Sequence, residues 1–228
     1  MPFSIEPIHV YGAIAAAIGA LLASDWLRER GRRRGLQAFA EVHGLTFVAR
    51  RDELGTQQLP YFLSGQNRRC RNVLSGAWEG VTVTVFDYTH TVVVGQAMIG
   101  SRRAERVRTC VLLDSGLSAR QLDIAWRRAW DDFPASGALI DVPAGHEDFD
   151  RTWRMRATDP RFAQQVLGEE LRTWLVAAGP DVRFELGGRW LLLVSARAGA
   201  QQLPALLAAA REFRARIAPQ ARDLHPAR

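Results

Sequence analysis

Lysine is absent from this sequence, and all 30 basic residues of the 228-residue chain are arginine. This absence excludes the phosphate-binding lysine of a P-loop, a Schiff-base lysine and the ATP-binding lysine of a protein kinase. The exclusive use of arginine, together with abundant alanine, indicates a GC-rich coding sequence and therefore a bacterial source.

Cysteine and linear catalytic motifs are also scarce. Cys70 and Cys110 are too few for a disulfide framework and lack a metal-binding spacing, so we predict that both are buried apolar residues. The sequence contains no G-x-S-x-G, no H-E-x-x-H, no P-loop and no dinucleotide fingerprint. These absences favour a protein that is not an enzyme and needs no cofactor, although many active sites have no linear signature.

One long segment near the N-terminus lacks charge. It runs for eighteen residues from Pro7 to Ser24 and reads PIHVYGAIAAAIGALLAS. As a helix it would be about 27 Å long, close to the roughly 30 Å hydrocarbon thickness of a bilayer. His9 and Tyr11 would lie at one membrane interface and Trp26 at the other, where amphipathic rings prefer to lie. We therefore predict an N-terminal transmembrane helix.

A cluster of arginines, here called the basic collar, follows this segment. It consists of Arg28, Arg30, Arg32, Arg33 and Arg34. With Glu29 among them the collar carries a net charge of +4, whereas Glu6 is the only charged side chain before the apolar segment. The positive-inside rule then predicts a single-pass protein of the inner membrane whose remaining chain is cytoplasmic. Trp26 and the collar are the predicted membrane-binding residues, at about 1 kcal/mol per arginine on anionic headgroups.

Two other interpretations of the N-terminus stay open. A cleaved signal peptide needs basic residues before the apolar run and small residues at the cut, whereas Leu21 and Leu22 stand near the expected site. The segment would otherwise be a helix that is buried in a soluble protein or lies on its surface. A further prediction is a homodimer, because Gly12, Ala16 and Ala20 form a face of small residues.

Nucleic acid is not a predicted partner; the lipid bilayer is. The chain carries a net charge of +6, of which residues 1–34 account for +2, so the other 194 residues carry +4 with acids interspersed. This density of positive charge is low for a nucleic-acid-binding domain, and zinc-finger spacing and aromatic-basic RNA motifs are absent.

Downstream of the collar the hydrophobic pattern predicts both strands and helices. One hairpin is predicted from 72–78 and 81–88, and a second from 182–186 and 190–195 around Gly187-Gly188. Helices are predicted at 35–43, 122–130, 161–178 and 203–217.

Hairpins outnumber strand–helix–strand units, which favours an α+β fold with a mainly antiparallel sheet. Composition supports a globular chain, with 47% hydrophobic and 24% charged residues. We predict an anchor with its collar (1–34), a first α+β subdomain (35–134) and a second one (135–228).

The stretch FDYTHT, residues 86–91, places an acid and an imidazole close together. Strand alternation puts Asp87 on the face of the preceding valines and His90 on the opposite face, so the two side chains diverge in a straight strand. If the chain bulges between them, Asp87 and His90 are the best catalytic candidates, and a hydrolase that uses them is the enzymatic alternative.

A second polar group is the only dense set of potential metal ligands. It contains His146, Glu147, Asp148 and Asp150, but no second histidine or cysteine stands at a metal-binding spacing. We interpret it as a loop that enters a strand at 149–157, and we expect no metal site.

Several of these segments resemble one protein family. The block at 72–88 (NVLSG followed by VTVTVFDY), the GLTF segment at 44–47 and the segment at 149–162 are similar to an uncharacterised family of bacterial membrane-anchored proteins. The resemblance covers most of the chain after residue 35 and implies an N-terminal apolar helix with an α+β domain, but no activity. The predicted function is a membrane-anchored interaction or scaffold module; the alternatives are the hydrolase and a soluble protein that binds a small ligand.

Overall fold

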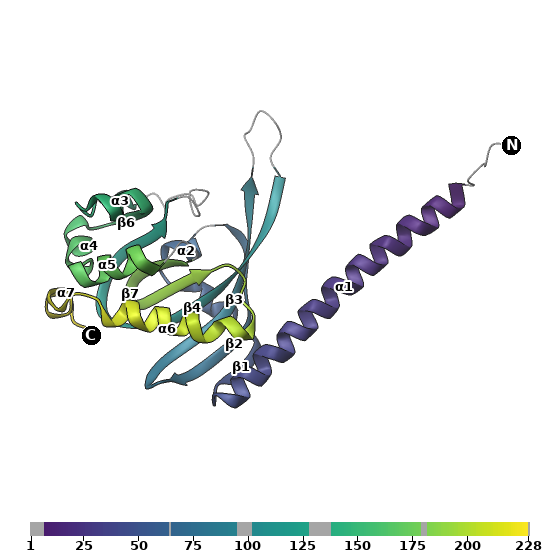
Figure 1. Ribbon diagram of the computed structural model, residues 1–228, viewed down its shortest axis with the longest axis horizontal. Helices are drawn as coiled ribbons and strands as arrows, with labels where there is room; N and C mark the ends of the chain where they lie inside the picture. The colour runs from purple at the N-terminus through teal and green to yellow at the C-terminus, as the bar shows by residue number, and fades with distance from the viewer. Residues whose placement is uncertain (1–6, 64, 95–101, 128–137, 179–181, 228) are drawn as a thin grey trace.

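The computed structural model shows a long helix that projects from a domain built on one antiparallel sheet (Figure 1). The structure describes the backbone of residues 7–63, 65–94, 102–127, 138–178 and 182–227. Within these ranges it describes every side chain except those of residues 7–22, 25, 93, 94 and 102.

Helix α1 spans Pro7–Val42 without interruption. Its N-terminal part extends away from the domain, and only its last turns lie against the sheet (Figure 1). The predicted apolar segment, the basic collar and the predicted helix at 35–43 are therefore parts of one helix. Gly44 follows the helix as its cap, and its φ of 66° allows the Leu45 N–H to donate to the Ala40 carbonyl at 2.8 Å.

The predicted membrane span coincides with the projecting part of α1. Its residues up to Leu22 lie outside the side chains that the structure describes. Among the described residues, no helix combines the length and the apolar character that crossing a membrane requires.

Within the described residues, seven strands form one sheet. They are β1 (Thr46–Arg50), β2 (Gln66–Trp78), β3 (Val81–Val94), β4 (Arg102–Trp126), β5 (Ile140–Asp141), β6 (Trp153–Ala157) and β7 (Val182–Ser195). Every pairing among them is antiparallel. The predicted hairpin at 72–88 is confirmed as β2 and β3, and its turn residues Glu79 and Gly80 both have positive φ, as a tight hairpin turn requires.

Strand β4 is the central strand of this sheet. Its residues 109–113 lie between β3 and β7, and its residues 122–125 lie between β6 and β7. The helix predicted at 122–130 is therefore wrong as far as Trp126, and its residues 128–130 lie outside the described residues. Leu122 and Trp126 are four apart, a spacing that suits one face of a helix and equally one face of a strand.

The second predicted hairpin is also wrong. Strand β7 continues through Gly187 and Gly188 and pairs with β4 on both sides of an irregular register between Asp114 and Leu122. A Cβ at Gly187 would lie 2.9 Å from the Gln58 carbonyl oxygen. Glycine is needed there because another backbone segment approaches closely, and not because the chain turns.

Most of the helices cover one face of the sheet. They are the last turns of α1 together with α3 (Glu147–Thr152), α4 (Pro160–Val166), α5 (Glu169–Ala178), α6 (Leu203–Ala215) and α7 (Pro219–Leu224). The opposite face carries a smaller aromatic core around α2 (Pro60–Leu63). Two short 3-10 helices, η1 (Asp52–Thr56) and η2 (Ala200–Gln202), complete the described elements.

Two boundaries in the second half differ from the prediction. The helix predicted at 161–178 is two helices, α4 and α5, which are separated by Leu167 and Gly168. Gly168 packs closely against Ala218, and a Cβ at this position would lie 3.0 Å from that of Ala218. The strand predicted at 149–157 begins as α3, and only Trp153–Ala157 is extended.

The structure is thus an α+β fold with a mainly antiparallel sheet, as predicted. The predicted boundary between residues 134 and 135 lies outside the described residues. Strand β4 on one side of it pairs with β6 and β7 on the other, so the two predicted subdomains share one sheet and both hydrophobic cores that cover its faces.

Candidate functional site

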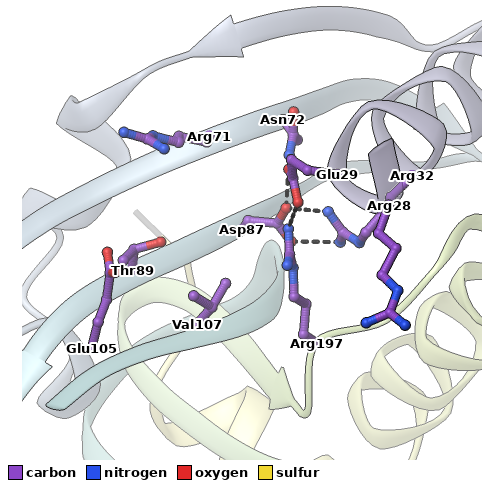
Figure 2. Close-up of a pocket in the computed structure, with 10 residues that line it drawn as sticks. All are labelled: Arg28, Glu29, Arg32, Arg71, Asn72, Asp87, Thr89, Glu105, Val107 and Arg197. Atoms are coloured by element: carbon purple, nitrogen blue, oxygen red, sulfur yellow. Dashed lines mark hydrogen bonds and ion pairs between the residues drawn. The ribbon is translucent and has the colours of Figure 1, made fainter. Parts of the chain in front are cut away.

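A polar cleft of about 660 Å³ lies where α1 meets the sheet. Figure 2 shows the residues that line it: Arg28, Glu29, Arg32, Arg71, Asn72, Asp87, Thr89, Glu105, Val107 and Arg197. They come from α1, β2, β3, β4 and the loop after β7. Arg71 and Glu105 lie on the other side of the cleft from Arg32, and Arg28 extends away from Asp87 (Figure 2).

The centre of the cleft is an ion pair, here called the Arg32–Asp87 clamp. Arg32 donates from Nη1 to Asp87 Oδ2 at 2.5 Å and from Nη2 to Oδ1 at 2.7 Å. Its Nε and Nη2 also donate to the Ala198 carbonyl at 3.0 and 2.6 Å. The side chains of Arg32 and Asp87 are only 14% and 5% exposed. A bidentate pair of this kind sets the orientation of α1 as well as its position.

Two further donors complete the surroundings of Asp87. Asn72 Nδ2 donates to Oδ2 at 2.9 Å, and Thr109 Oγ1 donates to Oδ1 at 3.3 Å. Asn72 has a φ of 50° and sits at an irregularity in the pairing of β2 with β3, which turns its amide towards Asp87. Thr109 also accepts from the Ala198 N–H at 2.9 Å, so the clamp joins a helix, three strands and a loop.

A second ion pair borders the clamp on its solvent side. Arg197 Nη2 donates to Glu29 Oε2, and both side chains are close to half exposed. Burial by itself would raise the pKa of Glu29, but the hydrogen bond and charge of Arg197, with the charge of Arg32, outweigh it and lower the pKa. This rim pair therefore favours the ionised carboxylate.

The clamp is better suited to holding than to catalysis. Asp87 accepts four hydrogen bonds from three side chains and is 4% exposed. A carboxylate with its lone pairs engaged in this way is a poor general base, because protonation would break the interactions that orient it. The cleft is lined by positively charged arginines and negatively charged carboxylates, which suits a polar and charged partner.

The structure does not bring Asp87 and His90 together. Asp87 faces α1, whereas His90 lies on the opposite face of β3 and is fully buried. Its ring packs against Tyr61 and Tyr88, with ring centroids 5.5 and 5.2 Å away. Burial, then the charges of Arg108, Arg68 and Arg106, lower the pKa of His90 to about 4.

The predicted membrane-binding residues divide into two groups. Arg32 is directed to the sheet and belongs to the clamp, a role that the sequence did not indicate. Trp26 is 57% exposed, and the Arg30 guanidinium lies 5.0 Å from the centre of its ring. Arg28, Arg33 and Arg34 are exposed as well, which leaves them accessible to a membrane surface.

The acidic residues near His146 include one, Asp150, that stabilises the loop at 144–146. Asp150 accepts from the backbone N–H groups of Ala144, Gly145 and His146 at 2.8, 3.0 and 3.2 Å. Among the described residues no group of three or more histidine, cysteine, aspartate or glutamate side chains is placed to hold a metal. Cys70 and Cys110 are both buried and free, and burial raises the pKa of each thiol.

A second charged cluster, here called the buried cluster, lies within the sheet. It consists of Asp123 on β4, Arg156 on β6, and Arg183 and Glu185 on β7. Arg156 donates to Asp123 Oδ2 at 2.8 and 2.5 Å, and Arg183 Nε lies 2.7 Å from Asp123 Oδ1. Arg183 also pairs with Glu185, which accepts from the Tyr61 N–H at 2.8 Å. All four side chains are at most 5% exposed.

Sequence reasoning missed both charged sites. Arg32 and Asp87 are 55 residues apart, so no local pattern connects them. For the buried cluster the local pattern points the other way, because Arg183 and Glu185 alternate with Val182, Phe184 and Leu186. Such alternation is typical of a strand whose charged face is exposed to solvent, and tertiary packing buries that face here.

Comparison with known proteins places the fold and goes no further. Neither a protein-family model nor a curated protein matches this chain. The crystal structure of the mycobacterial trehalose monomycolate transport factor A, TtfA, matches it with a TM-score of 0.63. The match covers 82% of this chain and 94% of that one at 15% sequence identity. At this identity the likeness establishes a shared fold.

Proposed function

We propose that this protein is a single-pass membrane-anchored module of the inner membrane that holds a cytoplasmic interaction domain against the bilayer. The observation that carries the proposal is the continuity of α1, from the apolar segment to the turns that the Arg32–Asp87 clamp ties to the sheet. A flexible linker would leave the distance and the orientation of the domain relative to the membrane variable. A continuous helix with a bidentate clamp holds it at one distance and in one orientation.

The distance follows from helix geometry. Ser24 ends the uncharged segment and Arg32 lies eight residues later, which is about 12 Å along a helix at roughly 1.5 Å per residue. The clamp and the cleft around it would then lie directly beneath the headgroups. The exposed collar arginines occupy the interval between them, where anionic headgroups attract positive charge.

We infer an accessory role in a membrane process for this module. The fold is shared with a protein whose name describes a transport factor for trehalose monomycolate, and that likeness supports an accessory role in a transport process. The mixed charges of the cleft suit a polar segment of a protein partner. A homodimer through the small residues of α1 stays a prediction, because Gly12, Ala16 and Ala20 lie outside the described side chains.

The test uses the full chain and a matched pair of double variants. Ala13→Arg with Ala17→Arg places two charges at the centre of the uncharged segment, at about 2.5–3.5 kcal/mol each against insertion. Ala205→Arg with Ala208→Arg makes the same changes at exposed positions of α6. We expect the wild type and the α6 variant to stay in the membrane fraction after carbonate extraction, and the α1 variant to be released.

Orientation is measured on the same membranes. Protease added to spheroplasts is expected to leave the domain of the wild type intact, and to digest it only after lysis. Release of the wild-type chain by carbonate, or digestion of the domain in intact spheroplasts, would overturn the proposal. Equal behaviour of the two arginine variants would show that the uncharged segment is not the anchor.

A further inference from the structure

Two parts of the molecule extend from the clamp towards the same side. One is α1, and the other is the end of the hairpin formed by β3 and β4, whose strands pair as far as Val94 and Arg102 beyond the edge of the main sheet (Figure 1). Strand β2 accompanies β3 only as far as the pair Gln66–Thr91. The described end of the hairpin is thus a two-stranded ribbon that faces the side where the apolar segment lies.

The lengths of the two parts can be compared because both start at the clamp. Asp87 and Val94 are seven residues apart on β3, which is about 23 Å at roughly 3.3 Å per residue. Arg32 and Ser24 are separated by about 12 Å along α1. The ribbon therefore reaches the level of Ser24 even if it is inclined by roughly 60° to the helix, since half of its length is still about 12 Å.

The ribbon and the three-stranded part of the sheet just below it are basic on both faces. Arg103, in the ribbon, lies opposite Val93, and Arg106, just below it, lies opposite His90, so the two arginines point to different faces. Arg68 and Arg69 on the neighbouring β2 are exposed, and Glu105 is the only acid on the described part of the β3–β4 hairpin beyond Asp87. In the sequence the seven residues that join the two strands carry no charge.

We propose that the basic end of the β3–β4 ribbon is a second membrane contact, which binds the headgroups of anionic lipids. This inference rests on the proposed function, because the comparison of the ribbon with α1 is relevant to a membrane only if the apolar segment of α1 lies in the bilayer. Charge complementarity selects an anionic lipid surface as the occupant, because the ribbon and the basic collar both carry exposed arginines. With α1, the ribbon would support the domain at two points and leave the cleft open between them.

The experiment uses the full chain in lipid nanodiscs. One set of discs contains phosphatidylglycerol and the other contains only phosphatidylcholine. Amide hydrogen exchange is measured for 92–94 of β3 and 102–107 of β4, which have a strand on one side only. On the anionic discs we expect exchange there to be about fivefold slower than on the neutral discs, because roughly 1 kcal/mol per arginine opposes local opening.

Two double variants with equal changes in charge make the comparison specific. Arg103→Glu with Arg106→Glu reverses the charge of the ribbon region and is expected to abolish the difference in exchange rate between the anionic and the neutral discs. Arg120→Glu with Arg161→Glu reverses two exposed arginines on β4 and at the start of α4, away from the ribbon, and is expected to preserve it.

The possible failures are distinguishable. If the chain enters the discs but exchange in the ribbon is the same with both lipids, the second contact is disproved and the anchor stands. If the chain does not enter the discs, the proposed function fails and this inference fails with it. Slower exchange in cell membranes but not in anionic discs would assign the surface to a protein and overturn the lipid contact.

Discussion

The molecule contains two clusters of opposite charges that are built for different tasks. The Arg32–Asp87 clamp joins elements that are distant in the sequence, at the border of a cleft. The buried cluster of Asp123, Arg156, Arg183 and Glu185 joins three neighbouring strands and has no access to solvent. The first positions the helix on the domain, and the second lies inside the sheet, where a charge that loses its partner is costly.

This difference follows from the alternatives open to each charge. When the clamp opens, water can enter the cleft and solvate Arg32 and Asp87, and the β2–β3–β4 ladder is untouched. When one member of the buried cluster is removed, its partners keep their charge in a site that water does not reach. Loss of one member of the buried cluster should therefore cost more stability than loss of one member of the clamp.

Removing Asp123 is expected to have the largest effect on stability. Asp123→Ala leaves Arg156 and Arg183 buried without their shared carboxylate, which costs about 3–5 kcal/mol in the free energy of unfolding. Urea denaturation of the full chain in detergent measures this. Asp148→Ala is the control, because Asp148 pairs with Arg151 at the surface and its loss costs less than about 1 kcal/mol. Equal losses in the two variants would contradict the assigned role of the buried cluster.

The buried cluster also predicts a dependence on pH. Burial raises the pKa of Glu185 from its ordinary value of 4.5 to about 7, against the charge of Arg183, which lowers it. The folded state then binds this proton more tightly than the unfolded state, so the contribution of Glu185 to stability is present below about pH 4.5 and lost as the pH rises to about 7.

Glu185→Gln should remove this dependence. Relative to wild type, its free energy of unfolding is expected to improve between pH 5 and pH 7, by at most about 1.4 kcal/mol per pH unit. His90 has the opposite sign, because its folded pKa of about 4 lies below its ordinary 6.5, and its contribution is lost as the pH falls. His90→Gln should therefore differ from wild type in the opposite direction, and parallel curves for both variants would refute the assignment.

Disrupting the clamp is expected to have the next largest effect on stability. Arg32→Ala, Asp87→Ala and the double variant form a cycle, and we expect a coupling of about 1–3 kcal/mol because each single change leaves a largely buried charge. Amide exchange in residues 26–36 should accelerate in all three variants, while exchange in 83–86 and 110–113 of the sheet stays slow. Arg34→Ala, on an exposed side chain of the same helix, is the control. Global unfolding in place of local release would contradict the contrast between the two clusters.

Parts of this architecture were predictable from the sequence because they depend on local patterns. The alternation of valine and threonine at 81–85 predicts β3, and it correctly places Asp87 and His90 on opposite faces. Asp159 followed by Pro160 predicts the start of α4, where the aspartate accepts from the N–H groups of Arg161 and Phe162. In each case the signal and the structure lie within a few residues of each other.

Other parts could not be predicted because tertiary contacts decide them. Residues 122–126 are extended because they pair with β6 on one side and β7 on the other, and the sequence of the segment itself does not indicate these pairings. Gly187 resembles a turn residue but serves the close approach of Gln58. For the candidate site the collar was evident as charge, yet the partner of Arg32 lies 55 residues away.

The smallest effect is expected at the rim pair of Glu29 and Arg197, which tests whether the clamp acts alone. Both side chains are over 40% exposed, so Glu29→Gln should cost less than about 1 kcal/mol. The pKa of Glu29 is lowered, because Arg197 and Arg32 outweigh the effect of burial, so its contribution is present above the ordinary pKa near 4.5 and lost as the pH falls below it. Amide exchange in residues 26–36 should stay near the wild-type rate at pH 7. If Glu29→Gln released α1 as fully as Asp87→Ala, the mount would be a distributed network, and the rigidity on which the anchor geometry depends would rest on solvent-exposed charges that salt can screen.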